Sequence, residues 1–133
     1  MNEIKEFLNK NNIFAIVGVS INPNKWGWKV YKNLKSSGFN VYPINPKHKK
    51  INNDTCYPDL KSMPKKPDVV ITIVKPEITE NIVKECKDLG IKKVWMQPGS
   101  ESEKSIDLCK KNNIKIVSKS CFVINNLNKK NND

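Results

Sequence analysis

Arginine is absent from this 133-residue chain: all 24 basic residues are lysines, set against 13 acidic residues, and the formal net charge is +11. A charge of this size raises the question of nucleic acid, an anionic membrane or a phosphorylated ligand. Arginine supplies the bidentate contacts that read guanine edges, so its absence argues against a specific nucleic-acid site. The lysines are spread along the whole chain, and we interpret most of them as a solvated surface.

Histidine and closely spaced cysteines are also scarce. The chain has one histidine, His48, and four cysteines, none of them in a CxxC pair: Cys56, Cys86, Cys109 and Cys121. This pattern excludes a zinc framework built from cysteine and histidine. We interpret the cysteines as reduced thiols, which favours a reducing, cytoplasmic compartment. For Cys121 a small core side chain is favoured over a reactive thiol.

Long apolar runs are missing as well. The longest, 13–19 and 69–74, are far shorter than the roughly 20 apolar residues that span a bilayer, and the first residues are acidic and amphipathic. We therefore predict neither a membrane span nor a signal peptide. The length predicts one domain, which we place at 1–124, followed by a polar tail over 125–133 that we expect to fray.

Short apolar segments alternate with amphipathic ones along the remaining chain. We predict strands over 13–17, 39–44, 69–74, 93–96 and 114–117. We predict helices over 3–10, 25–37 and 102–111, and between Pro76 and Gly90, with an irregular connection over 45–67. Strands that alternate with helices at this spacing predict right-handed crossovers. The expected fold is an α/β, Rossmann-like three-layer sandwich with a five-stranded, mostly parallel sheet.

Ligands of such sheets bind beyond the carboxyl ends of the strands. Four segments that follow predicted strands are rich in glycine, proline, asparagine, serine or lysine: 18–27, 43–47, 74–77 and 97–100. Any sheet needs turn residues, but four such turns at one edge favour a binding site.

The first turn differs from the fingerprint of NAD-binding proteins. Gly18 is followed by Ser20 where the second glycine of G-x-G-x-x-G would stand. The helix after this turn can still hold an anion at its N-terminus. The second strand ends in Asn45-Pro46-Lys47 and not in the acidic residue that grips a free ribose diol. Lys47 suits a ribose that carries its own phosphate, as in NADP or coenzyme A (CoA).

Five segments in order carry a family resemblance: 17–23, 38–47, 67–70, 94–99 and Cys121. They resemble the stand-alone CoA-binding protein family, whose members are similar to the N-terminal CoA-binding domain of the succinyl-CoA synthetase alpha subunit. The resemblance covers about residues 12 to 124, nearly the whole chain. It implies a Rossmann-like domain with CoA as its cofactor, lying over the turns after the first four strands.

The resemblance also implies which residues surround the ligand. By position these are Gly18, Val19, Ser20, Lys25, Trp26 and Gly27 near the phosphates; Asn45, Pro46 and Lys47 around the phosphorylated ribose and adenine; Val74, Lys75 and Pro76 near the adenine or pyrophosphate; and Gln97 and Gly99 beside the pantetheine. The family often has Phe-Arg where this chain has Val74-Lys75, and Asp-Arg where it has Lys119-Ser120. A lysine in place of the planar arginine fork weakens bidentate phosphate contacts.

Catalytic groups are few. His48 lies in a lysine-rich loop without a predicted partner, and we interpret it as an exposed surface imidazole. Glu77, Glu101 and Glu103 begin predicted helices, where carboxylates favour the helix dipole. We therefore expect a module that binds CoA or a short acyl-CoA, with no catalytic residue, no metal and no membrane contact; a protein partner stays open. The alternatives are a small NADP-dependent or acyl-CoA-processing enzyme and a basic nucleic-acid-binding domain.

Overall fold

A five-stranded parallel sheet forms the centre of the molecule in the computed structural model, which describes the backbone of residues 2–132 and the side chains of residues 4–127. The strands of this sheet lie in the order β2-β1-β5-β6-β7. Their bounds are β1 Ile13–Val17, β2 Asn40–Ile44, β5 Val69–Thr72, β6 Lys93–Met96 and β7 Lys115–Ser118. The helices are α1 Asn2–Phe7, α2 Trp26–Ser36, α3 Pro76–Leu89, α4 Glu103–Lys111 and α5 Phe122–Asn132. The predicted fold class is confirmed.

The strands end level with one another. Val17 of β1 lies beside Ile44 of β2 and Thr72 of β5, Thr72 lies beside Met96 of β6, and Met96 beside Ser118 of β7. All five carboxyl ends therefore open at the same edge of the sheet. The turns that follow them converge on one region, where an α/β sheet binds its ligands.

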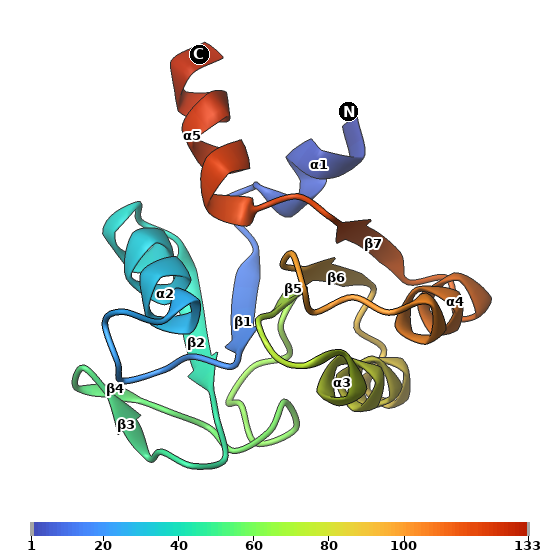
Figure 1. The fold of residues 1–133 in the computed structure, drawn as a ribbon, viewed down its shortest axis with the longest axis horizontal. Coiled ribbons are helices and arrows are strands. Elements are labelled where there is room, and N and C mark those ends of the chain that lie inside the picture. The colour runs from blue at the N-terminus through green and yellow to red at the C-terminus, as the bar shows by residue number, and fades with distance from the viewer. Residues whose placement is uncertain (1, 133) are drawn as a thin grey trace.

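Helices cover both faces of the sheet (Figure 1). On one face, α1, α2 and α5 pack over an aromatic cluster in which Phe14 and Phe122 lie 5.6 Å apart and Phe122 and Trp95 4.9 Å apart, centroid to centroid. On the other face, α3 and α4 bury Val83, Cys86 and Cys109 against the sheet. Strands covered on both faces need apolar side chains at nearly every position, which explains the continuous apolar runs of β1 and β5.

The C-terminal segment differs from the expectation. Residues 125–132 belong to helix α5, which was not among the predicted helices, and Asp133 lies outside the described residues. Phe122 is fully buried and Asn126 is 2% exposed, so one face of α5 is held against the core. The boundary predicted at 124 consequently falls inside a helix.

Smaller differences occur elsewhere. The predicted irregular connection over 45–67 contains a short hairpin, β3 Lys50–Ile51 and β4 Asp54–Thr55, which the hydroxyl of Tyr31 on α2 contacts by donating to the Asp54 carboxylate. The helix predicted over 3–10 ends at Phe7, and the strand predicted over 69–74 ends at Thr72. No helix in the part of the chain that the structure describes is long and apolar enough to cross a membrane.

Candidate functional site

Two glycines bring the start of α2 against the end of β1. Gly18 has φ +103°, and a Cβ there would lie 2.4 Å from the Ile73 carbonyl oxygen. A Cβ on Gly27, in the first turn of α2, would lie 2.2 Å from the Gly18 carbonyl oxygen. Only glycine fits such approaches without moving backbone. The positive end of the α2 dipole is thereby held at the edge of the sheet, next to the end of β5.

The turns after β1 and β2 are tied together by one side chain. The Asn45 amide nitrogen donates to the Val19 carbonyl oxygen at 2.8 Å, and the Asn45 amide oxygen accepts from the Lys47 N–H at 2.9 Å. Val19 itself is fully buried. The Ser20 hydroxyl accepts from the Asn22 N–H at 3.0 Å and keeps its own proton for donation. The Asn45 side chain therefore ties the two turns together, and Ser20 and the exposed Lys47 stay accessible.

A cavity of about 640 Å³ opens beside these turns, between the start of α3 and the loop after β6. Its volume lies within the range of small-molecule sites. Six residues predicted from the sequence line it: Trp26, Val74, Lys75, Pro76, Gln97 and Gly99. Eight others do not line it and lie on the neighbouring turns: Gly18, Val19, Ser20, Lys25, Gly27, Asn45, Pro46 and Lys47.

Five lining residues were not among the predicted set: Ile73, Pro98, Ser100, Cys121 and Ile124. The first three adjoin predicted residues along the chain. Cys121 corrects an expectation, because it is half-buried and faces the cavity and is not a core side chain. Ile124 belongs to α5, and the apolar residues at 122, 123, 124 and 127 were the signal that one more helix follows the last strand.

Gln97 fixes the loop after β6 against the start of α5. It is only 5% exposed, and its amide oxygen accepts from the Phe122 N–H at 2.8 Å while its amide nitrogen lies 3.5 Å from the Cys121 sulfur. The Ser100 hydroxyl, 2% exposed, lies 2.9 Å from the Thr72 hydroxyl and 2.7 Å from the Gln97 carbonyl oxygen. These contacts tie the loop after β6 to the end of β5 and to the start of α5.

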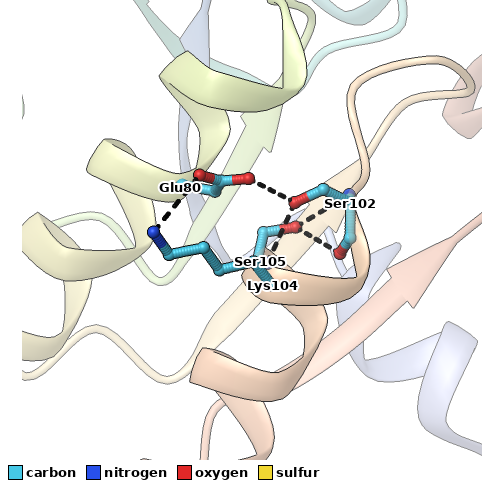
Figure 2. A network of polar contacts seen from close by, with 4 residues as sticks. All are labelled: Glu80, Ser102, Lys104 and Ser105. Carbon is cyan, nitrogen blue, oxygen red and sulfur yellow. Dashed lines mark hydrogen bonds and ion pairs between the residues drawn. The ribbon is translucent and has the colours of Figure 1, made fainter.

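A second network braces the same loop from outside (Figure 2). The Ser102 hydroxyl donates to the Glu80 carboxylate on α3 at 2.8 Å and accepts from the Ser105 N–H at 3.0 Å. Lys104 on α4 lies 3.9 Å from the same carboxylate. The Ser102–Ser105 pair forms a capping box at the start of α4. The network joins α3 to α4 and fixes the path of the backbone over residues 97–102.

The cavity contains few groups suited to proton transfer. None of the described residues that line it is a histidine or a carboxylate, and no group of three potential metal ligands occurs among the described residues. His48 is half-buried, not fully exposed as expected, and lies outside the cavity. Burial raises the pKa of the Cys86 thiol, and burial also raises the pKa of the Cys109 thiol to about 12. Both thiols therefore stay protonated at neutral pH.

Residues 12–126 match the family described as the CoA binding domain. The chain belongs to the CoA-binding domain family. This match confirms the resemblance inferred from the five sequence segments.

Relatives of this CoA-binding domain occur both alone and within larger enzymes. The chain is 29% identical over 131 residues to the alpha subunit of ADP-forming acetate–CoA ligase II from Pyrococcus furiosus, which aligns with 90% of this chain and 28% of the ligase subunit. The chain thus spans less than a third of that relative. A hypothetical protein from Pyrococcus horikoshii has a TM-score of 0.90 at 30% identity, with 96% of this chain and 89% of that chain covered. A conserved hypothetical protein from P. furiosus has a TM-score of 0.82 at 35% identity, with 85% and 97% covered.

Proposed function

We propose that this chain binds coenzyme A, or a short acyl-CoA, across the turns at the carboxyl edge of its sheet, without a complete catalytic apparatus of its own. The observation that carries the proposal is the position of the cavity. It lies between the ends of β5 and β6 and the start of α2, in a chain whose residues 12–126 match the CoA-binding domain family. Ligands of open α/β sheets bind at this edge.

The parts of the ligand are assigned by charge and exposure. The phosphates lie against the turn of Gly18 and Ser20 and the start of α2, with Lys25 beside them. The phosphate on the ribose lies near Lys47, which is exposed and follows β2. The pantetheine enters the cavity between Val74 and Gln97. Val19 and Asn45 support these turns from within, since Val19 is fully buried and the Asn45 amide donates to the Val19 carbonyl oxygen.

Binding without catalysis is supported by the cavity lining. An acid, a base or a metal would be needed for most reactions of a thioester, and the described lining residues include no histidine and no carboxylate. The ligase subunits to which the chain is similar are more than three times as long. We therefore propose ligand binding alone for the part of the chain that the structure describes.

Calorimetric titration of the purified chain with CoA, dephospho-CoA and NADP tests the proposal. CoA should bind saturably, dephospho-CoA at least about fivefold more weakly, because it lacks the phosphate that Lys47 faces, and NADP weakest. Titrations at two salt concentrations separate this specific contact from the general attraction of a charge of +11. Failure of all three ligands to bind would overturn the proposed function.

The role of Lys47 has a matched control two residues along the chain. Lys47→Ala should lower CoA affinity at least about fivefold and leave dephospho-CoA affinity nearly unchanged. Lys49→Ala removes the same charge from another exposed position and should affect neither ligand. Equal effects of the two substitutions would show that Lys47 contributes only to the overall charge.

Trp26 provides an optical signal for binding. It is 61% exposed and lines the cavity, with the Lys29 ammonium 5.2 Å from its ring centroid, whereas Trp95 is fully buried and Trp28 packs against the core. Saturating CoA should change the fluorescence of the protein because the ligand displaces water from the Trp26 ring. Trp26→Phe should remove most of that change, and Trp28→Phe should retain it. An undiminished signal in Trp26→Phe would place the ligand away from Trp26.

A further inference from the structure

The cavity walls are mainly apolar. Four segments that are distant in sequence contribute to them: the start of α2, the segment after β5, the loop after β6 and the start of α5. The large apolar residues in these walls are Trp26, Ile73, Val74, Pro76, Pro98 and Ile124. Trp26 and Ile124 are 61% and 57% exposed, respectively, although both are large and apolar. A ligand group that covered them would remove apolar surface from water.

The polar side chains buried in these walls already have partners within the protein. The Gln97 amide is engaged with Phe122 and Cys121, and the Ser100 hydroxyl with Thr72 and the Gln97 carbonyl. A phosphate or hydroxyl group placed against them would lose its water and gain little in return. The walls are therefore poorly matched to the polar half of CoA.

Charge is confined to the rim. Of the described residues that line the cavity, Lys75 alone is charged, and it is exposed at the start of α3. Lys25, Lys47 and the positive end of the α2 dipole lie on neighbouring turns outside the cavity. Anionic groups are thus favoured at the mouth and apolar groups inside.

We propose that the cavity holds the acyl chain of a CoA thioester, so that the physiological ligand is an acyl-CoA with an apolar chain of several carbons. The inference rests on the proposed function and names the ligand class that this site prefers. The phosphates remain on the turns after β1 and β2, and the pantetheine enters the cavity between Val74 and Gln97. The acyl chain at its end packs among Ile73, Pro98 and Ile124.

Titration with CoA, acetyl-CoA, butyryl-CoA and hexanoyl-CoA tests the inference. Full burial of each added methylene would strengthen binding about threefold to fourfold, so hexanoyl-CoA should bind at least about tenfold more tightly than acetyl-CoA. Equal affinity for CoA and all three thioesters would overturn the inference and leave the proposed function standing. Absence of binding by every ligand, CoA included, would overturn both.

A substitution at Ile124 tests where the chain lies. Ile124→Asn should reduce the ratio of hexanoyl-CoA to CoA affinity at least about fivefold, because it places an amide against the chain. Leu127→Asn is the matched control: Leu127 lies three residues along α5, is 48% exposed and does not line the cavity. Leu127→Asn should have the same ratio of hexanoyl-CoA to CoA affinity as the unaltered protein. A ratio that Ile124→Asn leaves unchanged would contradict the placement.

Cys121 supplies a second reporter of position. It is the one half-buried thiol, since the other three cysteines are buried, and it lines the cavity. At equal saturation, hexanoyl-CoA should slow the reaction of Cys121 with a maleimide at least about fivefold more than acetyl-CoA, because neither thioester has a free thiol and only the longer chain fills the cavity. Equal protection by both thioesters would show that the chain lies outside the cavity and would overturn the inference.

Discussion

Gly18→Ala should lower the free energy of unfolding by about 3 kcal/mol or more and abolish CoA binding in any protein that stays folded. The backbone at Gly18 has φ +103°, and an added Cβ would lie 2.4 Å from the Ile73 carbonyl oxygen and 2.7 Å from a methyl carbon of Val74. The obstruction is backbone at the end of the buried strand β5, so relief requires moving that strand end. Ile73 and Val74 line the cavity, and the site would be displaced with them.

Gly38→Ala separates the cost of the positive φ from the cost of the steric overlap at the added Cβ. Gly38 also has a positive φ, +89°, but an added Cβ would meet nothing within 4 Å, and the residue follows α2 away from the cavity. This variant should lose only about 1 to 2 kcal/mol from the unfavourable backbone conformation and should bind CoA normally. Urea unfolding and CoA titration of both variants provide the comparison. Equal destabilisation would mean that the close approach at Gly18 relaxes easily.

Trp95→Ala should lower the free energy of unfolding by about 4 kcal/mol. Trp95 on β6 is fully buried, with its ring centroid 4.9 Å from that of Phe122 and 5.8 Å from that of Phe7, and its indole N–H donates to the Ser120 carbonyl oxygen at 2.8 Å. The substitution therefore leaves a cavity between the sheet, α1 and α5 and an unpaired carbonyl. Because α5 carries Ile124, we also expect the preference for hexanoyl-CoA to weaken.

Trp95→Phe distinguishes packing from the hydrogen bond. It keeps most of the apolar contact with Phe122 but loses the bond to Ser120, and should cost about 1 to 2 kcal/mol. Urea unfolding measures both variants. A loss below about 1 kcal/mol for Trp95→Ala would contradict the view that this ring connects β6 to α5.

Much of the fold follows from local patterns in the sequence. Continuous apolar runs predicted β1 and β5, because strands covered by helices on both faces have no solvent-facing side. The stripe of apolar residues at helical spacing, together with Gly90, predicted the C-terminal end of α3 to within one residue. The helix ends there because Gly90 adopts the left-handed backbone conformation. The C-terminal helix was missed, because its polar composition hides a short apolar start anchored by the buried Phe122.

The chain sequence alone establishes the parallel sheet, the edge at which its turns meet and the family, because each depends on residue types and spacings that lie close together along the chain. Only the tertiary structure decides which side chains at that edge line the cavity. The Asn45 side chain donates to the Val19 carbonyl oxygen and ties two turns together, while Cys121 and Ile124 come from the C-terminal part of the chain to line the cavity. Side-chain direction depends on partners brought together by folding, and no local pattern of residues encodes those partners.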